Sequence, residues 1–323
     1  MTAPRRKIPS VNLDDYRSGT SEQRARMVET LGGGLVEFGF LNVEAHGIEP
    51  ALIRRTYDLW KQFFELPEEV KKRYVGGTGG ARGYTPFGVE HAKNNPTPDL
   101  KEFYHVGQEA DSAAALPDGH PAKEVYPANV WPEAIPEIHE PTVHLFRRLE
   151  ETAATLLEAL AEYFDLPRRQ FADMAVNGNS LLRILHYPAV PKGIPAGAVR
   201  AAAHEDINLI TLLCEATDSG LEIFTREGEW MAVETGPGEI VVDAGDMLSR
   251  HLNEVVPATT HRVVNPGDTS RERYSMPFFV HPYSNADLTV HPRFVTEERP
   301  AKYPPITAGQ FLEQRLIEIG LKK

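Results

Sequence analysis

Short β-forming segments follow one another through the second half of the chain, and this pattern limits the possible folds more than any other feature. After residue 178, segments rich in β-branched and aromatic residues alternate with turns that contain Gly, Pro or Asp. The segments are 180–187, 199–216, 220–225, 229–234, 238–243, 258–264 and 273–281. Many short strands separated by turns are typical of an all-β sandwich or barrel. We therefore predict a mainly β core over residues 179–300.

The rest of the chain has a mostly helical pattern. Helical spacing of apolar residues predicts helices over 21–39, 49–65, about 133–164 and about 307–321. GFLNVEAHGI (39–48) indicates one short strand, whereas 93–132 is rich in Pro, Asp and Gly and predicts irregular structure. The predicted fold class is thus α+β with a mainly β core. Residues 1–178 would form a mixed, mostly helical region packing on the barrel, 179–300 the core, and 301–323 a C-terminal helix.

A possible metal site begins with His204 and Asp206, which are two residues apart. If 199–216 is one extended strand, both side chains point to the same face. The β-branched segment 258–264 can form the return strand and supply His261 as a third ligand. Two imidazoles and one carboxylate leave the opposite side of a metal open, an arrangement diagnostic of non-heme Fe(II) oxygenases.

A His-x-Asp pair alone is weak evidence, because two common residues occur two apart by chance in many proteins. Here the pair follows the small residues of 201–203 and precedes the apolar run 207–213. We therefore place it at the mouth of a buried strand, where a ligand can approach closely. The alternative is a solvated strand edge without function.

Arg273 and Ser275 form a second pair with strand spacing. On one face of a strand, the guanidinium can grip a carboxylate while the hydroxyl donates a further hydrogen bond. Together with the metal triad, this clamp points to an iron enzyme with an oxoacid cosubstrate.

The segments that carry these residues resemble a known family. AAAHEDINLITLLCEATDSGLEIF (201–224) and RERYSMPFFVHP (271–282) resemble the 2-oxoglutarate/Fe(II)-dependent dioxygenase superfamily, in the branch of isopenicillin N synthase and the plant oxidases and hydroxylases. IPSVNL (8–13) and LVEFGFLNVEAHGI (35–48) are similar to the N-terminal region of that branch. The resemblance covers most of the chain and implies a double-stranded β-helix, or jelly roll, of two facing sheets.

By this resemblance, His204, Asp206 and His261 bind Fe(II). Arg273 and Ser275 bind the distal carboxylate of 2-oxoglutarate, and Tyr187 matches a tyrosine that often adds its hydroxyl to the same carboxylate. The implied reaction uses O2 and converts 2-oxoglutarate to succinate and CO2 while the substrate is oxidised. Hydroxylation of a small molecule, such as an amino acid, a peptide or a secondary metabolite, is the expected outcome.

Two other functions stay open. An oxidase or cyclase like isopenicillin N synthase would use the same iron site without 2-oxoglutarate, and Arg273 would then hold the substrate's own carboxylate. Neither Gln310 nor Gln314 has the terminal context of the glutamine near the end of that synthase, which weakens this alternative. A non-catalytic jelly roll that holds zinc or a sugar is the other possibility, and the complete triad and clamp argue against it.

The substrate is the least defined part of the prediction. Arg82-Gly83-Tyr84 and Phe103-Tyr104-His105 lie in the region that lines the mouth of the site in related enzymes. Arg82 could bind a substrate carboxylate, while Tyr84 and Phe103 could form an apolar wall. Structural packing of the aromatic side chains is the alternative.

The remaining histidines and the lone cysteine have simpler interpretations. His186 and His281 lie on predicted core strands, and we expect structural or supporting roles for both. Cys214 has the same parity as His204 and would face the barrel interior if 199–216 were one strand. A lone buried cysteine is, however, usually a small hydrophobic residue.

Composition limits the partners. The formal net charge of −12 argues against binding nucleic acid through its phosphates. We find no apolar run long enough to span a bilayer and no apolar stretch after the basic start that would indicate a secretory signal. The single cysteine permits no intramolecular disulfide and fits a reducing compartment. We therefore expect a cytoplasmic enzyme with a small-molecule substrate, and neither nucleic acid nor membrane as a partner.

Overall fold

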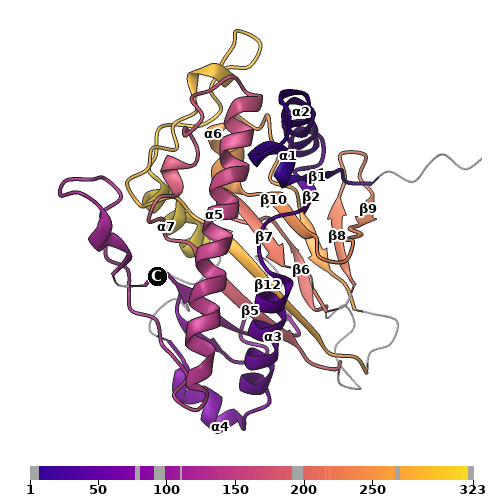
Figure 1. The fold of residues 1–323 in the computed structure, drawn as a ribbon, viewed down its shortest axis with the longest axis vertical. Coiled ribbons are helices and arrows are strands. Elements are labelled where there is room, and N and C mark those ends of the chain that lie inside the picture. The colour runs from indigo at the N-terminus through magenta and orange to yellow at the C-terminus, as the bar shows by residue number, and fades with distance from the viewer. Residues whose placement is uncertain are drawn as a thin grey trace, which may run out of the picture.

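Two facing β-sheets with helices packed on one side form the core of the molecule (Figure 1). The computed structural model describes residues 7–76, 81–90, 99–109, 111–190, 199–214, 216–217, 219–265 and 270–318. The glycine-rich segment 76–80 lies almost entirely outside the described residues. The jelly-roll architecture of the sequence prediction is confirmed.

Among the described residues, one sheet has eight strands and the other has four. In spatial order, the large sheet contains β1 (Ser10–Asn12), β2 (Phe40–Glu44), β10 (Ile240–Ala244), β7 (Ile210–Cys214), β12 (Arg273–Val280), β5 (Leu181–Tyr187), β4 (Glu102–Gly107) and β3 (Gly83–Thr85). The small sheet contains β6 (Ala201–His204), β11 (His261–Val263), β8 (Leu221–Phe224) and β9 (Trp230–Ala232). Neighbouring strands are antiparallel, except that β1 is parallel to β2.

The helices are mostly N-terminal to the β core. The α-helices are α1 (Leu13–Arg17), α2 (Ser21–Phe38), α3 (Pro50–Phe64), α4 (Glu68–Lys71), α5 (His139–Tyr163), α6 (Asp246–His251) and α7 (Ala308–Glu318). Short 3₁₀ turns occur at Lys72–Tyr74, Ser112–Ala115, Pro136–Ile138, Asp173–Ala175 and Pro292–Phe294. In the described part of the chain, no helix has the length and apolar composition to cross a membrane.

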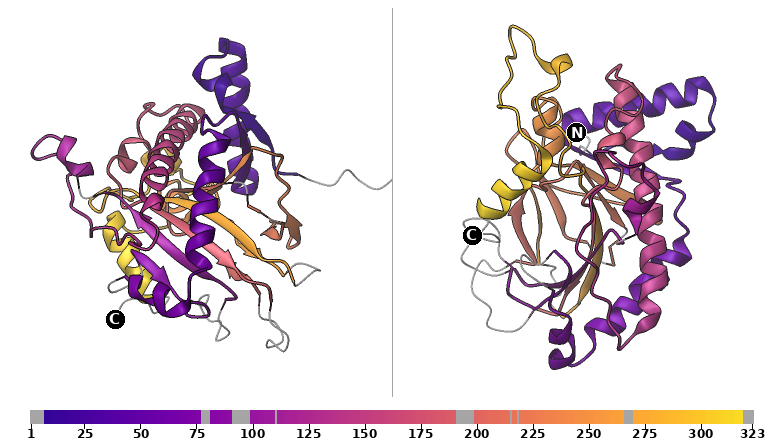
Figure 2. Two further views of the ribbon diagram at one scale, coloured as in Figure 1. Left: turned by 60° about the horizontal axis from the view of Figure 1, so that its bottom comes forward. Right: turned by 90° about the vertical axis from the view of Figure 1, so that its left-hand side faces the viewer.

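The two faces of the large sheet have different surroundings. Helix α5 crosses in front of this sheet, and the right-hand view of Figure 2 shows α2 and α5 on the same side of the strands. On this outer face, Phe278 meets Phe146 of α5 edge-to-face, with ring centroids 4.8 Å apart. Residues of opposite parity point inward, and Phe40, Ile223 and Val241 pack together between the two sheets. Strand parity therefore decides which side chains can reach the interior.

Two expectations from the sequence need correction. The segment 199–216 is not one strand, because the chain leaves β6 after His204 and turns before β7 begins at Ile210. The segment 93–132 contains a regular strand, β4. In the N-terminal region, β1 to β4 all belong to the large sheet. The domain boundaries near 178 and 300 stay a prediction.

Helix α2 shows how a helix accommodates three consecutive glycines. Its N-cap is Thr20, whose side chain accepts from the backbone N–H of Gln23 in a capping box. A Cβ at Gly32 would lie 2.0 Å from the ring of Tyr163, and one at Gly34 would lie 2.5 Å from Pro9. Two of the glycines are therefore required by close packing.

Candidate functional site

The two candidate histidine ligands lie side by side on neighbouring strands. His204 at the end of β6 is paired directly with His261 at the start of β11, and their ring centroids are 4.4 Å apart. Asp206 follows just beyond the end of β6. One ligand atom from each of the three side chains lies within 4.8 Å of the others. The structure thus brings the predicted triad together, although Asp206 comes from a turn and not from the strand itself.

Both imidazole rings are oriented by backbone carbonyl groups. Nδ1 of His204 donates to the carbonyl of Ala202 over 2.7 Å, and Nδ1 of His261 donates to the carbonyl of Thr259 over 3.1 Å. A carbonyl oxygen can only accept, so each ring carries its hydrogen on Nδ1 and has a lone pair on Nε2. Each Nε2 lies 3.9 Å from Oδ1 of Asp206. In metal-binding histidines, the ring nitrogen that does not bind the metal usually donates a hydrogen bond of this kind.

Asp206 is held by contacts that the sequence did not reveal. The hydroxyl of Thr211 on β7 donates to Oδ2 of Asp206, which leaves Oδ1 directed toward the imidazoles. The same hydroxyl accepts from the side-chain amide of Asn208 over 2.9 Å. The carbonyl of Asp206 accepts from the backbone N–H of Asp246 over 2.7 Å, at the start of α6. The turn after β6 is thus tied to both β7 and α6.

The electrostatics of the cluster favour a neutral imidazole at His204. Loss of hydration, followed by the charge of His261, lowers the pKa of His204 to about 4. Burial, followed by the charge of Asp206, raises the pKa of the buried Asp243 on β10 well above its usual value. Neutral imidazole is the state that binds a metal. The two imidazole nitrogens and the carboxylate oxygen therefore form a donor set that fits Fe(II).

Arg273, Ser275 and Tyr187 are also brought together, on the inner face of the large sheet. Arg273 is paired directly with Tyr187 across β12 and β5, and its guanidinium carbon lies 5.0 Å from the centroid of the tyrosine ring. Nη1 of Arg273 donates to the hydroxyl of Ser275 over 3.1 Å. All three residues are 2% exposed. A carboxylate bound here would be removed almost completely from water.

A buried network of charged side chains lies beside both clusters. Lys101 contacts Glu90 at 2.9 Å and Asp99 at 2.8 Å, and Oδ1 of Asp99 accepts from the backbone N–H of Ala202 over 3.0 Å. Lys101 is close enough to interact electrostatically with both Tyr187 and His204. Sequence reasoning missed this network, because its members lie in and around a segment that looked irregular.

The three residues expected to contact substrate lie in different places. Phe103 of β4 points inward and packs with Leu185 and Tyr187. Arg82 also reaches the inner face, where its guanidinium lies over Gly107. Tyr84 points the other way and packs on Phe63 of α3, with its hydroxyl donating to Glu102. For Tyr84 the structural alternative therefore applies, because neighbouring residues of a strand face opposite sides.

Cys214 and His281 lie on opposite faces of the large sheet. Cys214 is fully buried in the core under the helices rather than in the barrel interior, because β7 starts anew after the turn. Burial raises the pKa of its thiol to about 12, so it is an inert apolar residue. His281 follows β12, and its Nδ1 has no hydrogen-bond partner among the described residues. His186 lies on the outer face, with its ring stacked on Tyr274.

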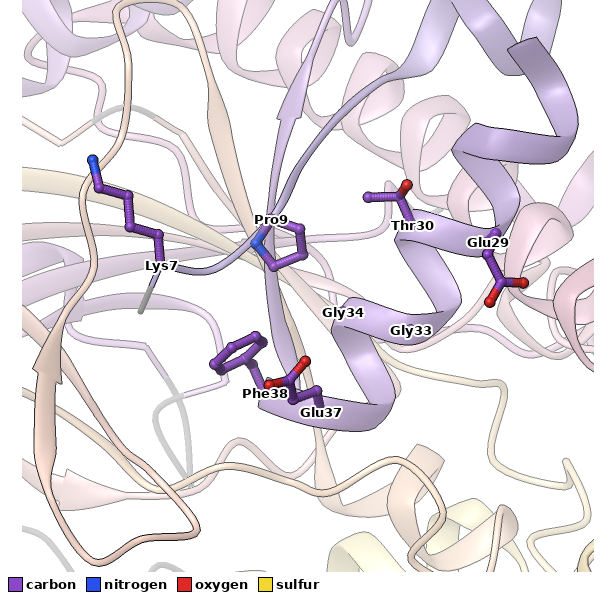
Figure 3. A pocket seen from close by; sticks show the side chains of 8 residues that line it. All are labelled: Lys7, Pro9, Glu29, Thr30, Gly33, Gly34, Glu37 and Phe38. Carbon is purple, nitrogen blue, oxygen red and sulfur yellow. The ribbon is translucent and has the colours of Figure 1, made fainter. Parts of the chain in front are cut away.

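Two hollows occur away from these residues. A surface groove of about 440 Å³ lies between α2 and the start of the chain, as Figure 3 shows. It is lined by Lys7, Pro9, Glu29, Thr30, Gly33, Gly34, Glu37 and Phe38. A smaller cavity of about 110 Å³ lies between the end of β4 and α5, next to Gln108 and Glu150. Neither contains a residue of the triad or the clamp.

The comparisons with known proteins agree on one family. Residues 8–134 match a family described as non-haem dioxygenase in morphine synthesis N-terminal, and residues 178–282 match the 2OG-Fe(II) oxygenase superfamily. The 2-oxoglutarate-dependent dioxygenase imqE of Aspergillus flavus is 30% identical over 96% of this chain and 93% of its own length.

Solved structures are similar over nearly the whole chain. A protein of Caulobacter crescentus assigned to the 2OG-Fe(II) oxygenase family is 42% identical, with a TM-score of 0.84 over 97% of this chain and 99% of that one. A full-length Neurospora crassa protein, solved in complex with alpha-KG and thymine, is 28% identical, with a TM-score of 0.83 over 96% of both chains.

Proposed function

Since this chain belongs to the 2-oxoglutarate/Fe(II) oxygenase superfamily and is a 2-oxoglutarate- and Fe(II)-dependent dioxygenase, we propose that it hydroxylates a small molecule. The reaction consumes O2 and 2-oxoglutarate and releases succinate and CO2, so that one oxygen atom enters succinate and the other enters the substrate. The observation that carries the proposal is the direct pairing of His204 with His261 beside Asp206.

In this proposal His204, Asp206 and His261 hold the iron. The two Nε2 atoms and Oδ1 of Asp206 are the donor atoms, and the carbonyl groups behind each Nδ1 keep the rings in place. Bound Fe(II) supplies the activation of O2 and the oxidation of 2-oxoglutarate. The protein holds the three donors on one side, which leaves the other side for cosubstrate and O2.

Arg273, Ser275 and Tyr187 bind the distal carboxylate of 2-oxoglutarate in this proposal. The guanidinium and the two hydroxyls present hydrogen-bond donors in a place that is almost closed to water. There a charge-assisted pair is strong, and an acid of the wrong length leaves a buried cation unpaired, which is costly. The clamp thus selects the cosubstrate by the position of its second carboxylate.

The oxidase alternative gains no support from the C-terminal helix. The side-chain carbonyl of Gln310 accepts from the backbone N–H of Thr307 over 3.0 Å, as a cap at the start of α7. Gln314 is exposed on the same helix. A hydroxylase therefore stays the favoured function, with Phe103 and Arg82 as candidate contacts for its substrate.

We also propose that the enzyme acts in the cytoplasm and without nucleic acid. The net charge of −12 and the reduced, buried Cys214 support this. Thymine is the ligand named for the Neurospora protein, and a free small molecule of similar size is our expectation here. Cell fractionation, together with a gel-shift assay at low salt, tests both parts.

The triad is tested by metal content and by conversion of 2-oxoglutarate without substrate. His261→Ala and Asp206→Ala should both fail to retain iron and should form no succinate above background. His144→Ala is the matched control, because His144 is exposed on α5. Stoichiometric iron and undiminished succinate formation in the His261→Ala protein would contradict the assignment.

A further inference from the structure

The guanidinium of Arg82 occupies a defined place on the inner face of the large sheet. A Cβ atom at Gly107 would lie 2.0 Å from Cζ of Arg82, so only glycine leaves room for it there. Gly107 is paired with Leu181, which is paired with Phe279, which is paired in turn with Thr211. Directly paired residues share a face, so Arg82 faces the same side as the hydroxyl that holds Asp206.

Most of the hydrogen-bonding capacity of Arg82 is unused. Nη1 donates to the carbonyl of Ala81 over 2.7 Å, whereas Nε and Nη2 are buried and have no hydrogen-bond partner in the described part of the chain. The residue is only 5% exposed. Glu109 is close enough to interact electrostatically, but its carboxylate accepts from Asn129 instead. Burial lowers the pKa of Arg82 to about 10, as expected for a cation without a close counter-ion.

The two unpaired nitrogens lie on the same edge of the guanidinium. Nε–H and the adjacent Nη2–H point in parallel and match the two oxygens of a carboxylate. A buried arginine whose donors on this edge meet no group of the described residues destabilises the free protein. A bound carboxylate would satisfy both donors and restore the charge balance.

The inner face between Arg82 and the triad is less tightly covered than the outer face. Leu181, Arg183 and Phe279 on this face are only half-buried, whereas Leu182, Ile184 and Phe278 on the other face of the same strands are completely buried. The Arg183 cation is already engaged, because it donates to His105 over 2.6 Å and contacts Glu90 at 3.1 Å. Of these two arginines, Arg82 is therefore the one that keeps donors for a ligand.

Resting on the proposed function, we propose that Arg82 binds a carboxylate of the substrate and that the substrate is a small carboxylic acid. Three strand spacings separate β4 from β7, which carries Thr211. At about 4.8 Å per spacing, and less along a concave sheet, the carboxylate lies about 10–14 Å from the oxidised carbon. Phe279 and Leu181 contact the apolar part of the substrate between these two points.

The test compares acids with their neutral amides. Octanoate and 5-phenylvalerate, the two primary amides and octyl phosphate are titrated calorimetrically into the anaerobic holoenzyme that contains Fe(II) and 2-oxoglutarate. At least one acid should bind about 10 to 100 times more tightly than its amide, because hydrogen bonds to a charged group strengthen binding by about this factor. Arg82→Gln should remove this preference, and Arg55→Gln on the exposed side of α3 should keep it.

A second variant tests the same contact without removing the charge. Gly107→Ala displaces the flexible end of Arg82 from its position and should abolish the preference for acids in the same way. Equal binding of acid and amide in the wild type, no binding of either acid, or a preference that survives both variants would overturn the inference. Tighter binding of octyl phosphate than of octanoate would overturn the assignment to a carboxylate.

The two proposals fail in different ways. The visible absorption of the Fe(II)–2-oxoglutarate complex is recorded for each protein before the titration. If the band is absent in the wild type, the proposed function has failed. If the band is normal in every variant and the acids show no preference, only the role of Arg82 has failed.

Discussion

At Asp206, one hydroxyl group determines how the carboxylate is presented to the metal. Thr211 donates to Oδ2 from the neighbouring sheet, and Oδ1 is left to face both imidazoles. Thr211→Val keeps the shape of the side chain and removes this bond. We expect iron affinity to fall about 10- to 100-fold, as for the loss of other partners that orient metal ligands.

The measurement is a competition for Fe(II) against a chelator of known affinity. Thr155→Val is the control, because the Thr155 hydroxyl only bonds to the carbonyl of Glu151 on the exposed side of α5. Unchanged iron affinity in the Thr211→Val protein would show that the turn alone holds Asp206 in place.

Arg273 is the second residue whose removal has a clear consequence. Arg273→Ala leaves the distal carboxylate of 2-oxoglutarate without its counter-ion in a site that is almost closed to water. Breaking a buried charged pair costs about 3–5 kcal/mol, so the 2-oxoglutarate concentration for half-maximal succinate formation should rise a hundredfold or more. Ser275→Ala should have a smaller effect, because it removes one neutral donor. An unchanged cosubstrate requirement in the arginine variant would contradict the clamp.

Within the element α2, adjacent glycines should respond in opposite ways to the same substitution. Gly32→Ala places a methyl group 2.0 Å from the ring of Tyr163 and should destabilise the protein by about 1–3 kcal/mol. Gly33→Ala meets no atom within 4 Å, at the groove visible in Figure 3. It should stabilise the helix by up to about 1 kcal/mol.

Thermal unfolding of the two variants and the wild type provides the comparison. Both substitutions change the same residue type in the same helix, so a difference in sign isolates the packing against Tyr163. Equal destabilisation by both would mean that α2 does not pack as described.

The strands also show what could and could not be predicted from the sequence. Alternation and turn residues were enough for β5, β8 and β10, because one face of each strand meets the core. The break between β6 and β7 was missed. It is maintained by bonds to distant backbone, such as the N–H of Asp246 to the carbonyl of Asp206 and that of Gly245 to Leu209. The secondary-structure propensities of the residues do not reveal such contacts.

Strand β4 was missed for a related reason. Its inward-facing side includes His105, which Arg183 of β5 satisfies, and Lys101 just before the strand is paired with Glu90 and Asp99. Because these partners satisfy polar side chains inside the protein, the sequence of this strand lacks the usual alternation of apolar and polar residues. The triad residue types were predictable from spacing, whereas Thr211 and the Lys101 network required the tertiary structure.

For the molecule as a whole, one buried carboxyl group should make stability depend on pH. Burial raises the pKa of Glu150 on α5 to about 7, beside the cavity at the end of β4. Between about pH 4.5 and 7 the folded protein therefore holds a proton that the unfolded chain has lost. Stability falls as the pH rises through this window, by up to about 3 kcal/mol, and the cost is complete above it.

Glu150→Gln removes the titrating group and keeps the side-chain shape. The variant should gain stability relative to the wild type as the pH rises from 4.5 to 7, with a constant difference above pH 7. Denaturant unfolding at several pH values measures this, with the exposed Glu133→Gln as control. A constant difference across the whole range would mean that the carboxyl group is not perturbed.

The central claim, that the triad and the clamp bind Fe(II) and 2-oxoglutarate together, is tested most directly by an anaerobic optical titration. The apo-protein is titrated with Fe(II) and then with 2-oxoglutarate. We predict a visible charge-transfer band that requires both additions and that Arg273→Ala shows only at much higher 2-oxoglutarate concentrations. Stoichiometric iron binding without any band would contradict the account and would favour an oxidase in which Arg273 holds a substrate carboxylate.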